Sequence, residues 1–109
     1  MLKRNALMPV LLVLCLLLTL GVNSAFAQKY TAGTSAGFPP FEYIEDGKIV
    51  GFDIDLVHAI GEVMGFEVEF IDISFDSLIP ALNARNIDII AAGMTITEER
   101  GLVVDFSNP

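Results

Sequence analysis

The stretch that decides the fold runs from residue 51 to residue 92 and reads GFDIDLVHAI GEVMGFEVEF IDISFDSLIP ALNARNIDII AA. Apolar residues first recur in it at spacings of three and four, which is one face of a helix, and then gather in a short run rich in β-formers. Both patterns then appear a second time. This order predicts an α/β fold in which helices and strands alternate.

The first helix is expected to begin at Asp53, which can cap it, and to end at Gly65 in a left-handed conformation. Its apolar face consists of Ile54, Val57, Ile60, Val63 and Met64. His58 is read as a surface or packing residue of this helix. Asp53 and Asp55 lie two residues apart and therefore point to different sides, which argues against a paired-carboxylate site.

A strand over residues 66–71 follows, and Ser74 is the expected cap of a second helix. Pro80 lies in an early turn of that helix, where proline is tolerated, and Asn86 is predicted to end it. Residues 87–92 are apolar enough for a strand that is buried on both faces.

Working outward, residues 30–34 predict a further strand and residues 41–50 predict a hairpin. Together these elements predict a parallel-core sheet flanked by helices, with right-handed crossovers. In such sheets ligands bind where loops leave the carboxyl ends of strands. The loops at this edge are Ser35–Pro40, Ile73–Asp76 and Gly93–Thr97.

Residues 1–27 are typical of a cleavable secretory signal peptide. Lys3 and Arg4 precede an apolar run over residues 6–20, and Ala25-Phe26-Ala27 predicts cleavage after Ala27. A retained membrane helix is disfavoured because Pro9 and Gly21 leave too short an uninterrupted run. Cys15, the one cysteine, lies among bulky residues, which argues against a lipid anchor, and the exported part lacks thiolate ligands and disulfides.

From residue 28 onward four basic residues face all 14 acidic ones, a net charge of about −10. Such a surface repels nucleic acid and anionic lipid, so neither is an expected partner. No metal or cofactor site is expected. The exported part, residues 28–109, is small for a complete core and is interpreted as an incomplete domain truncated at its C-terminus.

The loop that follows the last strand offers an anion site. Backbone N–H groups near Gly93 and Thr95, with the Thr95 hydroxyl, form a concavity, and the Arg100 guanidinium matches the two oxygens of a carboxylate. The alternative interpretation makes Arg100 a solvated partner of nearby acidic residues, which contributes little. Those residues are Glu98, Glu99 and Asp105.

Aromatic residues on the other two loops suit a sandwich around a ligand side chain. Phe38 and Phe75 are the candidates, with core packing as the equal alternative. For Phe41 and Tyr43 core packing is the favoured interpretation.

Several blocks, taken in order, resemble the polar-amino-acid solute-binding proteins of ABC importers, which form family 3 of the extracellular binding proteins. They are Gly37-Phe38-Pro39-Pro40-Phe41-Glu42-Tyr43, Gly51-Phe52-Asp53-Ile54-Asp55-Leu56, Leu78-Ile79-Pro80-Ala81-Leu82, Asp88, Gly93 to Arg100 and Asp105-Phe106-Ser107. The resemblance covers nearly all of residues 30–109.

The resemblance implies a periplasmic-binding-protein-like fold of type II, in which two lobes close on a ligand. Residues 28–109 would form most of the first lobe, and the second lobe is missing from this chain. In the family, the position of Arg100 binds the ligand α-carboxylate, aided by the loop at Gly93 and Thr95, and the positions of Phe38 and Phe75 flank the side chain. The carboxylate that receives the ligand ammonium group belongs to the missing lobe.

Ser35 departs from the family pattern, because this ligand-binding position often holds an aspartate. The departure tells modestly against arginine, lysine or histidine as the ligand. The resemblance further implies a periplasmic, monomeric, non-enzymatic protein that delivers an amino acid to a membrane permease. Two alternatives share the fold: a periplasmic dehydratase of the cyclohexadienyl or arogenate type, and the ligand-binding domain of a sensor.

Overall fold

The computed structural model describes residues 9, 12 and 26–109. The predicted signal peptide therefore lies almost entirely outside the described residues. Within the described part of the chain, no helix is both long and apolar enough to cross a membrane.

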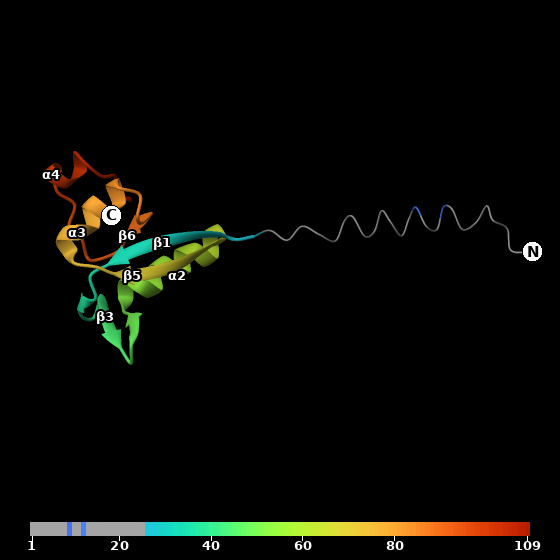
Figure 1. Cartoon of the computed structure of the whole chain (residues 1–109), viewed down its shortest axis with the longest axis horizontal. Helices are drawn as coiled ribbons and strands as arrows, with labels where there is room; N and C mark the ends of the chain where they lie inside the picture. Colours follow the sequence, from blue (N-terminus) through green and yellow to red (C-terminus); the bar gives the residue numbers. More distant parts are fainter. Residues whose placement is uncertain (1–8, 10–11, 13–25) are drawn as a thin grey trace, which may run out of the picture.

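The main sheet is parallel, as the alternation of helices and strands predicts. It contains β1 (Gln28–Thr34), β5 (Phe66–Asp72) and β6 (Ile89–Ile90) in the order β5-β1-β6 (Figure 1). Ala32 in the central strand lies opposite Phe70 on one side and Ile89 on the other, and it is fully buried. All three strands end at the same edge, so the loops that follow them lie near one another.

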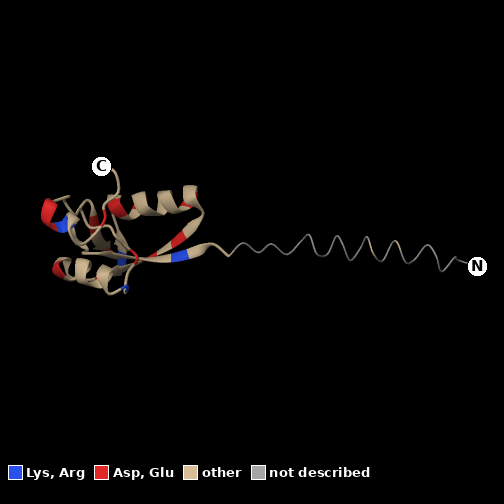
Figure 2. Cartoon of the chain, turned by 90° about the horizontal axis from the view of Figure 1, so that it is seen from above, with Lys and Arg blue, Asp and Glu red and all other residues tan. Residues whose placement is uncertain are grey.

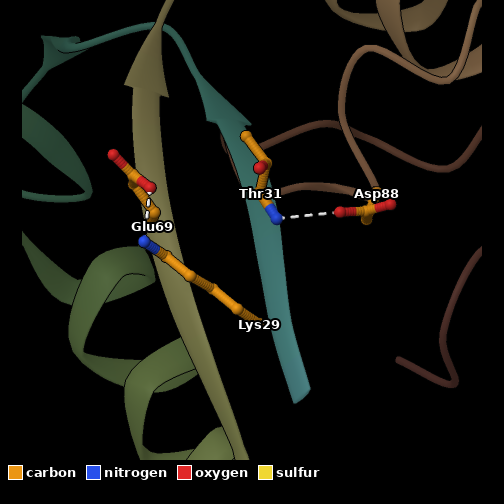
Figure 3. A network of polar contacts seen from close by, with 4 residues as sticks. All are labelled: Lys29, Thr31, Glu69 and Asp88. Atoms are coloured by element: carbon orange, nitrogen blue, oxygen red, sulfur yellow. Dashed lines mark hydrogen bonds and ion pairs between the residues drawn. The ribbon is translucent and has the colours of Figure 1, made fainter.

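The third strand is shorter than predicted, because a side chain takes over part of the ladder. The Thr31 N–H donates to the Asp88 carboxylate at 2.8 Å (Figure 3). The Asp88 N–H in turn donates to the Thr31 carbonyl at 2.8 Å. Beside this pairing, an exposed ion pair joins Lys29 Nζ to Glu69 Oε2 at 2.8 Å and raises the pKa of Lys29.

Helices α2 (Phe52–Met64) and α3 (Phe75–Asn83) lie on opposite faces of this sheet (Figures 1 and 2). The α3 side forms a core of Leu78, Ile87 and Ala92, all at most 4 % exposed. Acidic segments are spread over helices and strands, in keeping with the charge of the sequence (Figure 2).

The helix ends follow the predictions in part. Gly65 adopts the left-handed conformation at the end of α2 with a φ of 80°, as expected. Asn86 does not end α3; that helix ends three residues earlier, at Asn83, because Arg85 has a φ of 61°, which no helix continues. Ser74 lies at the cap position, but its hydroxyl contacts Ser77 Oγ at 2.6 Å instead of a backbone N–H.

Asp53 does not cap α2, since that helix begins one residue earlier and Gly51 is its cap position. The start of α2 instead lies against the backbone of the hairpin, and the Asp53 N–H donates to the Phe41 carbonyl at 3.0 Å. A Cβ on Gly51 would lie 2.2 Å from that carbonyl oxygen, and the φ of Gly51 is 132°. Only glycine permits this close approach.

The hairpin belongs to a second, antiparallel sheet, in the order β2-β3-β4. It contains β3 (Glu42–Glu45) and β4 (Lys48–Val50), as predicted, together with β2 (Gly37–Phe38) from the stretch expected to be loop. Phe38 lies opposite Glu42 in this sheet. Part of the stretch after β1, which was expected to be a loop, is therefore a strand. It lies near the edge where the strands of the main sheet end.

Candidate functional site

Arg100 lies in the short helix α4 (Glu98–Gly101), which follows the loop after β6. Thr97 caps this helix, since its hydroxyl accepts the Arg100 N–H at 3.2 Å. The Arg100 side chain turns back along the loop, where its Nη1 donates to the Thr95 carbonyl at 2.8 Å. Its guanidinium carbon lies 5.4 Å from the centre of the Phe75 ring, within the range of a cation–π contact.

These contacts hold the guanidinium in place and leave most of its five N–H donors available. Among residues 26–109 no ion pair joins Arg100 to Glu98, Glu99 or Asp105, which were the partners in the alternative interpretation. Arg100 and Phe75 both line an open hollow of about 300 Å³. The other lining residues are Asp76, Ile79, Met94, Glu99 and Val103. The hollow therefore offers a fixed cation beside an aromatic face.

The Gly93 N–H is not available to an anion, contrary to the sequence-based expectation. It donates to Asp53 Oδ2 at 2.8 Å, across 40 residues of sequence. The φ of Gly93 is 55°, in the region that favours glycine. Gly93 therefore anchors the loop Gly93–Thr97, here called the ligand loop, to the first turn of α2. Thr95 and Arg100 remain the candidates for contact with a ligand.

Phe38 lies beside Gly93, and a Cβ placed on Gly93 would be only 3.5 Å from the Phe38 ring. Its ring stacks on Phe41 with the centres 5.2 Å apart. Both rings are exposed, so Phe41 is not the core residue that the sequence favoured, whereas Tyr43 is half-buried. The candidate site residues thus fall into two groups. Phe38 and Gly93 form one group, and Phe75, Thr95 and Arg100 form the other.

Ser35 is half-buried just after β1, and its carbonyl accepts the Gly37 N–H at 2.8 Å. The next residue, Ala36, donates its N–H to Asp72 Oδ1 at 2.8 Å. The backbone at Ser35 is therefore tied to the end of β5, although no described contact joins Ser35 to the other site residues.

Glu42 is buried at this edge, although it was not among the site residues predicted from the sequence. Its side chain is 1 % exposed, and its Oε2 atom has no hydrogen-bond partner among the described residues. Burial, together with the charge of Asp53 and a hydrogen bond to it, raises the pKa of Glu42 to about 7. The signal that could have located Glu42 is its place between two rings in the stretch Phe41-Glu42-Tyr43, where polar and apolar residues alternate.

Known proteins are similar to this chain in sequence. The model of the bacterial extracellular solute-binding proteins, family 3, matches residues 30–109. The arginine-binding extracellular protein ArtP of Bacillus subtilis is 47 % identical over 81 residues, which are 74 % of this chain and 32 % of that protein. The ABC transporter arginine-binding protein 1 of Escherichia coli is 43 % identical over 103 residues, 94 % of this chain and 42 % of its own length.

Solved structures agree with the fold. Arginine-bound domain 1 from TmArgBP superimposes with a TM-score of 0.71 at 51 % identity, and the match covers 74 % of this chain and 65 % of that one. An ancestral arginine-binding protein matches in its arginine-bound form with a TM-score of 0.73 at 54 % identity, over 74 % of this chain and 36 % of that one. Its glutamine-bound form matches with a TM-score of 0.74 at 52 % identity, over 77 % and 38 %. The chain thus spans less than half the length of the two curated relatives.

Proposed function

The chain belongs to the bacterial extracellular solute-binding proteins of family 3, and we propose that the complete protein is the substrate-binding component of an ABC importer for a polar amino acid. Residues 28–109 would supply most of the first of two lobes, and the ligand would be enclosed when the lobes close. The relatives described above are binding proteins, which supports a binding role over catalysis.

The observation that carries this proposal is the position of Arg100. Its guanidinium is held by the Thr95 carbonyl at 2.8 Å and by the Phe75 face at 5.4 Å, and it opens into a hollow. A planar guanidinium with free N–H donors suits the α-carboxylate that all amino acids share. The Thr95 hydroxyl, in an exposed loop, would add a second donor.

The aromatic residues would contact the ligand side chain. Phe75 presents its ring beside Arg100, and Phe38 presents an exposed ring beside Gly93. Rings of this kind stack on an aliphatic chain, an amide or a guanidinium. The arginine-bound structure of domain 1 from a relative supports the idea that a first lobe supplies much of the binding surface.

Two observations favour different ligands. Ser35 lacks the charge that the resemblance assigns to its position, which favours a neutral polar side chain. The relatives and structural neighbours described above are named for arginine, although one of them was also solved with glutamine. We propose arginine as the first ligand and glutamine as the second, because aromatic faces bind a guanidinium without a carboxylate partner.

The location and the partners follow from the same family. The signal-like residues 1–27 support export to the periplasm, where a soluble monomer would meet a membrane permease. The acidic surface, with about −10 net charges after residue 27, does not suit anionic lipid or nucleic acid.

The test is titration calorimetry on the complete protein with arginine, glutamine, lysine and histidine. Replacement Arg100→Gln should weaken binding by about 2–5 kcal/mol, or roughly 30-fold to several thousand-fold, because the ligand carboxylate loses its charged partner. Arg85→Gln is the matched control, since it removes an equal charge from the exposed turn after α3.

Equal affinities for the parent protein and Arg100→Gln would contradict the proposed carboxylate contact. Ser35→Asp tests the choice of ligand, because a carboxylate at this position should favour arginine over glutamine. An unchanged ratio of the two affinities would show that residue 35 does not contact the ligand side chain.

A further inference from the structure

Three segments far apart in the sequence meet beneath the ligand loop. Asp53 in the first turn of α2 accepts the Gly93 N–H at 2.8 Å, just after β6. Glu42 in β3 contributes a second carboxyl group, whose Oε1 lies 3.8 Å from the place that a Cβ on Gly93 would occupy. Two carboxyl groups and one backbone N–H thus form a cluster outside the hollow beside Arg100.

The backbone brings these two carboxyl groups together. The Phe52 N–H donates to the Pro40 carbonyl and the Asp53 N–H donates to the Phe41 carbonyl, both at 3.0 Å. Gly51 permits this approach, as described above. The start of α2 and the start of β3 are therefore joined by backbone contacts, which keep the backbones of Glu42 and Asp53 near each other.

Glu42 and Asp53 both lie against Gly93, and the pKa of Glu42 is raised by its burial, by the charge of Asp53 and by hydrogen bonding to Asp53. Two carboxyl groups can share a hydrogen bond only when one of them carries a proton. Glu42 is the group that holds it, because it is 1 % exposed and faces a negative neighbour. On the elements packed around it, α2 contributes Asp53, β2 places Phe38 opposite it, and the ligand loop contributes Gly93. The cation of β4, Lys48, lies opposite Glu45 instead.

We propose that Glu42 and Asp53 are positioning residues, and that the proton between them sets the position of Gly93 and of the loop that carries Thr95 and Arg100. With Glu42 protonated, Asp53 accepts hydrogen bonds from both Glu42 and Gly93. When Glu42 ionises, two negative charges face each other in a buried site, and the repulsion pulls Asp53 away from the Gly93 N–H. Phe38 lies against Gly93 and moves with it.

The consequence for the ligand rests on the proposed function. If the loop binds the α-carboxylate, affinity is highest when Glu42 is protonated and falls as the pH rises through about 7. The expected loss is about two- to tenfold, which corresponds to one intramolecular hydrogen bond.

The first experiment needs no ligand. The amide resonance of Gly93 in the complete protein is followed by nuclear magnetic resonance over a pH series. We expect its shift to titrate with a midpoint near neutral pH in the parent, and to stay constant in Glu42→Gln. Glu45→Gln, an exposed neighbour on the same strand, is the matched control and should titrate like the parent. A constant Gly93 shift in the parent, or a titration that persists in Glu42→Gln, would overturn the proposal.

Should Glu42→Gln fail to fold, Asp53→Asn supplies the second variant. It keeps an oxygen that accepts the Gly93 N–H but removes the negative charge beside Glu42. The midpoint of the Gly93 titration should then move to lower pH, and an unmoved midpoint would overturn the coupling between the two carboxyl groups.

The second experiment measures arginine affinity by calorimetry between pH 5 and pH 8.5. The parent should weaken in the same pH range in which the Gly93 amide titrates, and Glu42→Gln should show no such change. A parent affinity that stays constant while Gly93 titrates would overturn the link to ligand binding. Failure of the proposed function looks different, because no amino acid would then bind at any pH while Gly93 still titrated.

Discussion

The core on the α3 side of the sheet and the edge where the loops leave it bury side chains of opposite kinds. Leu78, Ile87 and Ala92 in the core are apolar and at most 4 % exposed. At the edge, Glu42 and Thr34 are equally buried, and each keeps a polar atom that has no hydrogen-bond partner within the described part of the chain. The core is stabilised by contacts that any apolar neighbour can make. The stability of the edge depends instead on whether its buried polar groups are protonated and hydrogen-bonded.

The sharpest test of this difference is a cavity in the core. Leu78→Ala removes a fully buried side chain and should lower the free energy of unfolding by about 2–5 kcal/mol. Urea unfolding of the complete protein measures the loss. The affinity of the folded protein for arginine should change little, because Leu78 lies in the core on the α3 side of the sheet and does not line the hollow. Leu102→Ala is the control, since Leu102 is 85 % exposed and its loss should cost almost nothing. Equal losses for the two variants would contradict the assignment of the core.

At the edge, the prediction concerns pH. The pKa of Glu42 is raised from 4.5 to about 7, so the folded protein binds a proton over this range that the unfolded chain has released. Its contribution to stability is therefore complete below about pH 4.5 and is lost as the pH rises through about 7. A shift of this size corresponds to roughly 3 kcal/mol.

Unfolding of the parent and of Glu42→Gln at pH 5 and pH 8 measures this contribution. The variant carries a neutral side chain of the same shape, so it should gain stability relative to the parent as the pH rises. Glu45→Gln should show no such gain, since Glu45 is exposed. A stability difference between the parent and Glu42→Gln that does not change with pH would place Glu42 in contact with water.

The smallest expected effect concerns the cap of α4. Thr97→Ala removes the hydroxyl that accepts the Arg100 N–H and should cost about 0.5–2 kcal/mol of helix stability. Thr97→Ser keeps the acceptor and is the control. Because α4 carries Arg100, arginine affinity should fall modestly in Thr97→Ala and stay near the parent value in Thr97→Ser. A fall of the same size in both variants would show that the hydroxyl does not hold the helix.

The same contrast decides how much of the molecule could be predicted from the sequence. The existence of α2 and its buried face followed from the spacing of residues such as Ile54 and Val57, because periodicity records which face of an element is buried. The start of α2 was predicted one residue too late. The hairpin and the left-handed Gly65 followed from local turn chemistry. Asn86 failed as a helix end, because Arg85 adopts an unusual conformation that its residue type does not announce.

At the site, sequence alone indicated Arg100 and Phe75, and the structure places them in contact. The sequence did not indicate that the Gly93 N–H already donates a hydrogen bond within the protein. Its acceptor, Asp53, lies 40 residues away and was expected to cap a helix. The role of Ser35 and the sandwich between Phe38 and Phe75 remain predictions, since no ligand and no described contact tests them.

Two of the crowded glycines, Gly33 and Gly51, differ in what a side chain would meet. A Cβ on Gly33 would lie 2.6 Å from Ile87 Cδ1, the movable end of a side chain, whereas on Gly51 it would meet the Phe41 carbonyl, which is part of the backbone. Alanine can therefore replace Gly33 when a smaller side chain replaces Ile87 at the same time. Position 51 offers no such path, because a side chain there would push the hairpin backbone away from the start of α2.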